Sequence, residues 1–395
     1  MPRWTRTPAL HARDDFPHAW PAVALMQRVP ARPEAPVDTI DTPALVVDLD
    51  ILEANLDAMA ATVRAAGLRL RPHAKSHKCP AIAAMQVARG AVGVCCQKTD
   101  EAAALVDAGI GDVLVTNEVV APVKLARLAE LARRARVGVL CDDARAVPLL
   151  SGASTAAGAT LDVYVEADVG GHRCGVAPGE AVGELARAIA DAPGLRFAGL
   201  HCYQGAAQHL RTPPERRAAI EAATRAAVAS RDACVARGLR VDMITGAGTG
   251  TFEHEIASGV WTELQPGSYP FMDVDYARNV TADGAQRFRQ SLFVLAGVMS
   301  TPAPTRAICD AGLKAFAFDS GLPQVADRDG VAYVKASDEH GVLDVPAGNA
   351  ASLWGARIRL VPGHVDPTFN LYDFVVGCRG ERVEAVWPVA RGTLG

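Results

Sequence analysis

Short apolar runs alternate with longer amphipathic stretches from about residue 43 to about residue 265, and this alternation constrains the fold more than any other feature. Such alternation is typical of successive βα units around a parallel sheet. The longer stretches, such as Ile51–Ala65 and Pro214–Arg237, have the helical spacing of Leu, Ala and Val. Eight strands are predicted, a number that suits a closed (β/α)8 barrel: Ala44–Leu49, Leu68–Arg71, Val92–Cys95, Val113–Val115, Val137–Cys141, Leu161–Glu166, Phe197–His201 and Val241–Ile244.

After about Phe288 the pattern changes to short apolar runs separated by turn residues, which predicts a smaller β domain. The runs are Leu292–Met299, Arg306–Asp310, Val331–Lys335, Ile358–Pro362, Phe374–Val376 and Arg382–Trp387. We therefore predict an α/β protein in which a barrel over residues 41–287 precedes a β domain over residues 288–395. Residues 1–40 are expected to form a loosely held N-terminal arm or to join the β domain.

The composition favours an enzyme with a small-molecule substrate. The 395 residues allow two domains with large cores, and the net charge of −4 comes without a lysine or arginine tract. This balance argues against nucleic acid or a membrane surface as the main partner. The nine cysteines form no CxxC pair and residues 1–36 contain no continuous apolar segment, so we expect reduced thiols and a cytoplasmic location.

One lysine lies in a histidine-flanked loop directly after a predicted strand. An apolar and basic alternation stops at Pro72, and Lys75 follows between His73 and His77, with Lys78 close behind. A lysine amine forms a Schiff base only when it is deprotonated, and neighbouring cations lower its pKa. We predict that Lys75 is the reactive amine that pyridoxal phosphate requires, with Lys78 as the rival and a solvated basic loop as the alternative.

A glycine-rich loop, Thr245–Thr251, follows the last predicted barrel strand. Glycines let backbone N–H groups approach a phosphate, and barrels often hold phosphate after their last strands. The predicted phosphate ligands are Gly248, Thr249 and Gly250. Other polar residues also follow predicted strands, where the alternative is ordinary loop hydrogen bonding: Gln97, Asn117, Arg173 and Tyr203.

Several motifs together resemble one family of enzymes. They are Arg71–Lys78, Val92–Lys98, Asp112–Val119, Arg173–Val176, Tyr203–His209, Glu263–Tyr276, Asp310–Pro323, Ser337–Val342 and Leu360–Pro367. The chain resembles the fold-type III pyridoxal-phosphate enzymes related to alanine racemase, in the branch of D-threonine aldolase and D-serine dehydratase. Within this branch the motifs are most similar to those of the 3-hydroxy-D-aspartate aldolases.

The resemblance assigns roles to individual side chains around the cofactor. It implies that Lys75 carries pyridoxal 5'-phosphate and that Gln97, Arg173, Tyr203 and Tyr269 contact it. For Tyr269 the alternative is a core aromatic with a satisfied hydroxyl group. The resemblance also implies a homodimer in which the β domain of one subunit closes the active site of the other.

A second site is predicted in the C-terminal domain, where Pro362 and Pro367 bracket His364 and Asp366. In an extended segment, a spacing of two residues places both side chains on one face. From these residues alone the alternative is an exposed polar turn, whereas the resemblance implies that the pair is a divalent-metal site. D-Serine dehydratases of this branch look similar but have a cysteine in place of this aspartate. Because a carboxylate is a harder ligand than a thiolate, the aspartate favours Mg²⁺ or Mn²⁺, with Zn²⁺ as the alternative.

The resemblance implies a metal-dependent aldolase that cleaves D-3-hydroxy amino acids, preferably 3-hydroxy-D-aspartate to glycine and glyoxylate. His209 matches the general base, and its alternative is an ordinary residue at a helix start; Asp319 and His340 are weaker candidates for substrate or partner-subunit contacts. D-Threonine aldolase, a D-serine or 3-hydroxyaspartate dehydratase and a non-catalytic cofactor carrier are the other hypotheses. No residue is identified as the ligand of a distal carboxylate, so the aspartate preference depends on the resemblance alone.

Overall fold

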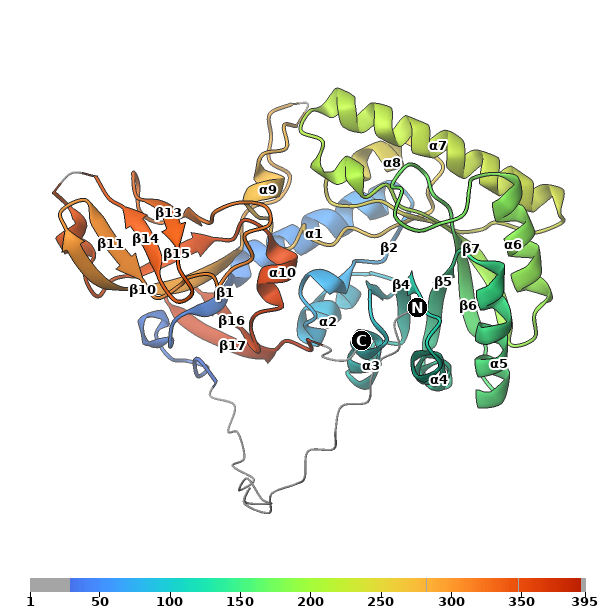
Figure 1. The fold of residues 1–395 in the computed structure, drawn as a ribbon, viewed down its shortest axis with the longest axis horizontal. Helices are drawn as coiled ribbons and strands as arrows, with labels where there is room; N and C mark the ends of the chain where they lie inside the picture. Colours follow the sequence, from blue (N-terminus) through green and yellow to red (C-terminus); the bar gives the residue numbers. More distant parts are fainter. Residues whose placement is uncertain (1–28, 282, 347, 392–395) are drawn as a thin grey trace, which may run out of the picture.

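The computed structural model describes residues 29–281, 283–346 and 348–391, and it contains two sheets (Figure 1). Residues 1–28 of the predicted arm over residues 1–40 lie outside this range. Among the described residues, none of the helices combines the length and apolar character that crossing a membrane requires.

The first sheet is the predicted barrel. Its eight strands are all parallel, in the spatial order β2-β9-β8-β7-β6-β5-β4-β3. They are β2 (Arg69–Leu70), β3 (Val94–Cys96), β4 (Asp112–Glu118), β5 (Arg136–Cys141), β6 (Leu161–Glu166), β7 (Leu195–Cys202), β8 (Ile244–Gly246) and β9 (Glu263–Leu264). Backbone bonds from Val92 N to Leu70 O and from Cys95 N to Pro72 O join the two edges. The sheet is therefore closed, as predicted.

Helices cover the outside of the barrel (Figure 1). They are α1 (Leu49–Ala65), α2 (Pro80–Ala88), α3 (Thr99–Asp107), α4 (Pro122–Leu131), α5 (Val147–Ala157), α6 (Glu180–Asp191), α7 (Pro213–Ala236) and α8 (Phe252–Ser258). In α6 the apolar residues Val182, Leu185 and Ile189 recur at helical spacing and are buried. The side chain of Asp48 accepts the Ile51 N–H and so caps α1 at its start.

One barrel strand is predicted wrongly and another is missed. Ala44–Leu49 was expected to open the barrel, but β1 (Ala44–Asp48) lies in the second sheet, antiparallel to β10 (Leu292–Ala303) and parallel to β16 (Phe374–Arg379). An apolar run shows that a strand is buried without showing which sheet buries it. The eighth barrel strand is instead β9, whose two residues are too few to produce an alternation. The glycine-rich loop therefore follows the seventh barrel strand rather than the eighth.

The second sheet confirms the smaller β domain and is mostly antiparallel. Besides β1, β10 and β16 it contains β11 (Arg306–Cys309), β12 (Gln324–Val325), β13 (Ala332–Ala336), β14 (Gly341–Asp344), β15 (Arg357–Val361) and β17 (Arg382–Pro388). Residues 29–40 pack against it, because Val37 and Ile40 are buried in one cluster with Val376 and Val383. The predicted domain limits at residues 41 and 287 stay predictions.

Two short helices connect the β domain to the mouth of the barrel. They are α9 (Val274–Ala277) and α10 (Val365–Phe369), and Figure 1 shows α10 between the second sheet and α2. Asp273 is fully buried at this junction, where its carboxylate accepts N–H groups from Tyr276 and Val365. The loops at the carboxyl ends of the barrel strands thus face α10.

Candidate active site

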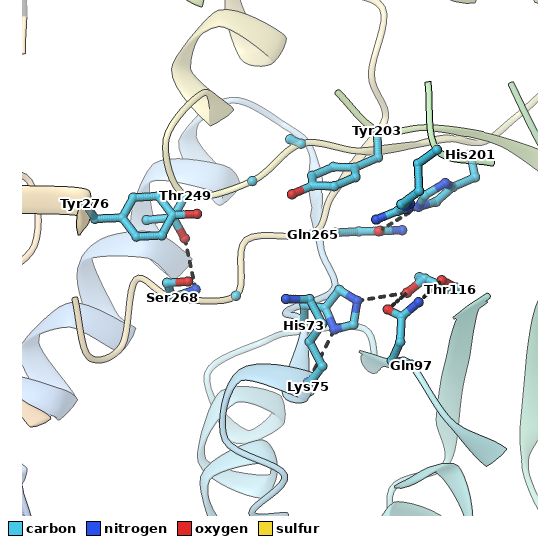
Figure 2. Close-up of a pocket in the computed structure, with 14 residues that line it drawn as sticks. His73, Lys75, Gln97, Thr116, His201, Tyr203, Thr249, Gln265, Ser268 and Tyr276 are labelled. Atoms are coloured by element: carbon cyan, nitrogen blue, oxygen red, sulfur yellow. Dashed lines mark hydrogen bonds between the residues drawn. The ribbon is translucent and has the colours of Figure 1, made fainter. Parts of the chain in front are cut away.

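A pocket opens at the carboxyl ends of the barrel strands (Figure 2). Most of the predicted cofactor residues line it: Lys75, Gln97, Arg173, Tyr203, Gly248 and Thr249. Sequence reasoning missed other lining residues: His73, Thr116, His201, Gln265, Ser268 and Tyr276.

Lys75 lies in a short 3-10 turn that begins after Pro72 and His73, and its Nζ lies 2.5 Å from Asp366 Oδ2. Burial alone would lower the pKa of Lys75, but the charge of Asp366 outweighs it and raises the pKa above the ordinary value. This result contradicts the expectation that cationic neighbours lower the pKa of Lys75. Burial keeps the pKa of His73 well below its ordinary value and lowers that of His77 to about 4, so both rings are neutral at pH 7.

A chain of hydrogen bonds fixes the orientation of His73 in the pocket (Figure 2). Its Nδ1 accepts the Lys75 backbone N–H at 3.3 Å, so its Nε2 donates to Thr116 Oγ1 at 2.8 Å. Gln97 approaches the same threonine, because its amide donates to Thr116 O at 2.8 Å. The hydroxyl group of Thr116 donates in turn to Cys96 O. One wall of the pocket is therefore held rigidly by the ends of β3 and β4.

Arg173 and Tyr203 form a second wall. The guanidinium carbon of Arg173 lies 5.7 Å from the centre of the Tyr203 ring, a distance that permits a cation–π contact. Arg173 also lies 3.4 Å from Glu166 at the end of β6. A planar cation is thus held beside an aromatic ring at the pocket.

The glycine-rich loop lies close to Gln208. A Cβ atom at Gly248 would overlap the Gln208 side chain, and Gly250 N donates to Gln208 Oε1 at 2.9 Å. Thr249 Oγ1 accepts the backbone N–H groups of Ser268 and Tyr269 at 3.1 Å each. Within the described residues, the N–H groups of Gly248 and Thr249 have no hydrogen-bond partner, although both residues line the pocket. These free donors fit the phosphate of pyridoxal phosphate, with the Lys75 amine in the same pocket.

Tyr269 differs from its predicted role. Its side chain is 1% exposed, its hydroxyl accepts a hydrogen bond from Gln86 at 3.1 Å, and its ring packs against Phe288. This environment fits the alternative of a core aromatic with a satisfied hydroxyl group. Tyr276 is the tyrosine from this part of the chain that lines the pocket.

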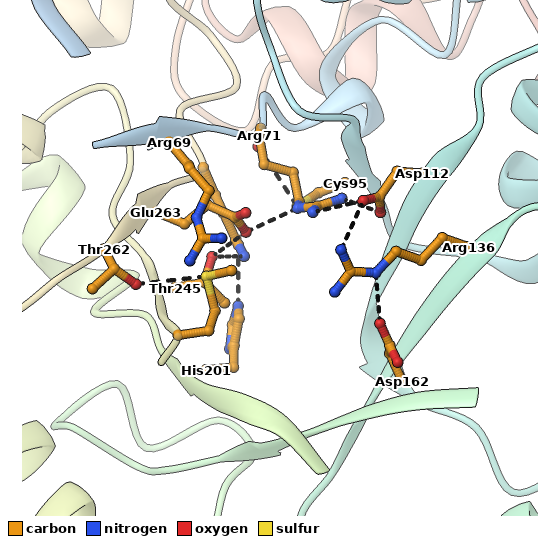
Figure 3. Close-up of polar contacts among 12 residues, drawn as sticks. Arg69, Arg71, Cys95, Asp112, Arg136, Asp162, His201, Thr245, Thr262 and Glu263 are labelled. Atoms are coloured by element: carbon orange, nitrogen blue, oxygen red, sulfur yellow. Dashed lines mark hydrogen bonds and ion pairs between the residues drawn. The ribbon is translucent and has the colours of Figure 1, made fainter. Parts of the chain in front are cut away.

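Below the pocket, a buried polar network fills the barrel interior (Figure 3). His201 donates to Gln265, whose amide donates to Thr245, and the hydroxyl group of Thr245 donates to Glu263 at 2.9 Å. Arg71 then pairs with Glu263 at 2.8 Å and with Asp112 at 2.6 Å. Burial lowers the pKa of His201 to about 4, so this ring is neutral at pH 7.

A wider cavity continues outward from Lys75 toward α10, and it is lined by the remaining predicted residues His209, His364 and Asp366, together with Asp319. Nδ1 of His209 lies 2.6 Å from the Asp275 carboxylate, which places the proton on that nitrogen and leaves Nε2 available. Burial would raise the pKa of Asp275, but Arg211, paired at 2.5 Å, and His209 lower it. Sequence reasoning missed Asp275, which the DVDY segment places beside His209.

The predicted metal pair does not lie in an extended segment, because His364 is the residue before α10 and Asp366 is inside it. Both side chains still line the outer cavity. His364 Nδ1 lies 2.6 Å from Asp319, which leaves Nε2 available, and Asp366 Oδ1 is buried with no partner within the described residues. An imidazole nitrogen and a free carboxylate oxygen are suitable donors for a divalent cation, so the pair fits a metal.

Comparison with known families agrees with this geometry. Residues 47–274 match the family described as alanine racemase, N-terminal domain, and residues 291–378 match the family described as putative serine dehydratase domain. The chain belongs to the alanine racemase N-terminal domain family. The resemblance inferred from the motifs is therefore confirmed, and members of this family with the second domain are fold-type III pyridoxal-phosphate enzymes.

Relatives of this alanine racemase family protein match it along almost its whole length. A D-threonine aldolase from Arthrobacter sp is 50% identical over 92% of this chain and 96% of its own. A 3-hydroxy-D-aspartate aldolase from Paracoccus denitrificans (strain Pd 1222) is 46% identical over 92% and 95%. The crystal structure of D-threonine aldolase from Filomicrobium marinum superposes with a TM-score of 0.90 at 51% identity, over 93% of this chain and 100% of that chain.

Proposed function

We propose that this protein is a pyridoxal-phosphate- and metal-dependent aldolase that cleaves D-3-hydroxy amino acids, with 3-hydroxy-D-aspartate as the preferred substrate. The observation that carries the proposal is the contact between Lys75 and Asp366. It brings the candidate cofactor amine and a candidate metal ligand together in one cavity, beside a histidine whose Nε2 is available. The aldolase names of the relatives add support.

The cofactor would be held by groups that line the inner pocket. Lys75 supplies the amine that bonds to it, and the N–H groups of Gly248 and Thr249 take the phosphate, with Gly250 completing the loop. Gln97, Arg173 and Tyr203 surround the ring. When bound, pyridoxal phosphate supplies an electron sink for the electron pair that is released as Cα–Cβ breaks.

The outer cavity supplies the proton chemistry. His209 accepts the proton of the substrate 3-hydroxyl at Nε2, because Asp275 keeps the other ring nitrogen protonated and stabilises the charge that forms. His364 and Asp366 would hold Mg²⁺ or Mn²⁺, or alternatively Zn²⁺, which would polarise that hydroxyl. Asp366 Oδ2 holds the Lys75 ammonium, and the free Oδ1 would bind the cation. The charge of that cation would oppose the effect by which Asp366 raises the pKa of Lys75.

The motifs support the preference for 3-hydroxy-D-aspartate. The sequence identity is slightly higher to the D-threonine aldolase, at 50%, than to the 3-hydroxy-D-aspartate aldolase, at 46%. A dehydratase would use the same residues to expel the hydroxyl group instead of breaking Cα–Cβ. A cytoplasmic homodimer is part of the proposal through the family resemblance.

Product analysis tests the proposal. Enzyme loaded with cofactor and Mn²⁺ is incubated separately with 3-hydroxy-D-aspartate and D-threonine, and glycine, glyoxylate, acetaldehyde, oxaloacetate and ammonia are quantified. Faster release of glycine with glyoxylate than of glycine with acetaldehyde is expected. The reverse order would replace the proposed substrate with D-threonine. Ammonia with oxaloacetate would refute aldol cleavage in favour of dehydration, and the Lys75→Ala variant provides the blank.

A further inference from the structure

A group of ligand-type side chains that the proposed reaction does not use lies on the far side of Arg173. Glu118 ends β4, Asp142 follows β5, and Cys174 lies in the loop after β6. One ligand atom from each lies within 4.8 Å of the others. Three adjacent barrel strands thus bring two carboxylates and a thiol to one point at the carboxyl end of the sheet.

A fourth side chain, Glu166, ends β6 next to Glu118 and is 4% exposed. Its Oε1 lies 3.4 Å from Arg173, but its Oε2 is buried and has no partner within the described residues. Glu118 Oε1 is also buried and unpartnered in this part of the chain. Glu118 and Glu166 therefore each have one buried carboxylate oxygen without a partner, and a buried charge requires a compensating group.

The local charges do not balance. Burial and the neighbouring Glu166 raise the pKa of Glu118 to about 7, and the nearby carboxylates add to the effect of burial on the Cys174 thiol, whose pKa is raised to about 11. Arg173 is the cation in contact with the cluster. His201 lies 3.8 Å from Glu166, but burial lowers its pKa to about 4 and it is neutral at pH 7. A positive charge at the cluster would relieve this repulsion.

We propose that Glu118, Asp142 and Cys174 bind a second divalent cation, with the free oxygen of Glu166 facing it. Binding forms a metal–sulfur bond as the Cys174 thiol releases its proton to solvent, and Glu118 binds as its carboxylate. One soft thiolate among carboxylates favours Zn²⁺ over Mg²⁺. Cys174 and Glu166 also line a cavity, which opens this side of the proposed site toward solvent.

The cation has a positioning role. Cys174 follows Arg173 directly in the chain. A cation that links Cys174 to the ends of β4 and β5 therefore fixes the loop that holds Arg173 over Tyr203. The free Glu166 oxygen is neutralised at the same time, while its other oxygen stays with Arg173. The site is separate from His364 and Asp366, which lie at the start of α10 and line the outer cavity.

Cobalt substitution tests the proposal, because a thiolate gives Co²⁺ a charge-transfer absorption that histidine and carboxylate ligands do not. Difference spectra are recorded between Co²⁺-loaded and Mg²⁺-loaded enzyme, each with its cofactor, and bound metal is counted per chain. The thiolate band is expected in the wild type and in His364→Ala, and its loss is expected in Cys174→Ser. Cys141→Ser is the matched control, because Cys141 adjoins Asp142 but its thiol points to Asp143 O.

Metal counts give the second readout. The wild type is expected to bind one cation more than Cys174→Ser, and Glu118→Gln is expected to lose the same cation while it keeps the thiol. Melting curves of the metal-free variants confirm that each one is folded. A wild type without the thiolate band, or a band that survives in Cys174→Ser, would overturn the proposal, and Glu118 and Glu166 would then share a proton instead. Neither readout depends on which substrate the enzyme cleaves.

Discussion

Replacing Arg71 with methionine is expected to destabilise the barrel strongly. The outer surface of the barrel should stay unchanged, because Arg71 is buried. The Arg71 side chain is 2% exposed, and its partners Glu263 and Asp112 are 0% and 20% exposed. Methionine fills most of the volume but leaves Glu263 as a buried carboxylate without its cation. Removal of one partner from a buried ion pair costs about 3–5 kcal/mol. The unfolding entropy is about 0.8 kcal/mol/K, from roughly 2.1 cal/mol/K per residue over the chain, so Tm should fall by about 4–6 °C.

The assay is thermal unfolding followed by circular dichroism, with Arg69→Met as the matched control. Arg69 precedes Arg71 by two residues, and among the described residues its guanidinium reaches only the exposed Asp242 carbonyl, at 3.4 Å. The control should change stability by less than about 0.5 kcal/mol. The double variant Arg71→Met with Glu263→Gln should recover part of the loss, because the uncompensated charge is gone. Equal losses of stability in Arg71→Met and Arg69→Met would refute the reasoning. So would a double variant that is no more stable than Arg71→Met alone.

Three further predictions concern the site and its surroundings. Asp275→Asn should lower kcat by about 100-fold or more, since His209 loses the acceptor that fixes its protonation, and a kcat within twofold of the wild type would exclude this role. Lys75→Ala should abolish the yellow absorbance of the bound cofactor, whereas Lys78→Ala should retain it; the opposite pattern would make Lys78 the reactive lysine. Burial raises the pKa of Glu255 from 4.5 to about 7. Ionisation of this carboxyl group therefore lowers the free energy of unfolding of the wild type. This loss is absent below pH 4.5, grows from pH 4.5 to 7 and is complete above pH 7. Glu255→Gln should therefore gain up to about 3 kcal/mol over the wild type across that interval, and a pH-independent difference between the two unfolding free energies would contradict this.

The barrel and the β domain could be predicted because their strands are long enough to show a period. Strands such as β6 are fully buried and mostly apolar, and they are bounded by helices, a pattern with few other interpretations. The assignment of β1 to the barrel failed because its partners β10 and β16 are distant in sequence. β9 was missed because Glu263 and Leu264 show no alternation, and Glu263 is buried only by virtue of its pair with Arg71.

The pocket was predicted in outline from residues that follow strands, and Lys75 and Gln97 lie where that rule placed them. The environment of Lys75 could not be predicted, because Asp366 comes from a segment almost 300 residues later in the chain. The same distance hid the pairing of His209 with Asp275. The sequence predicts His73 as an ordinary loop cation and His201 as a strand residue. Only their burial in the structure shows that both rings are neutral.

The position of β1 has a consequence for synthesis of the chain on the ribosome. β1 ends at Asp48, but β16, its parallel partner, begins at Phe374. At roughly 5–20 residues per second, about 15–60 s pass between the appearance of the two strands, and the whole barrel is made in the interval. The barrel can close without Ala44–Asp48, which stays unpaired until its antiparallel partner β10 appears at Leu292 and keeps one free edge until β16 follows. Nascent chains that stop before residue 292 should therefore expose this strand and recruit chaperones.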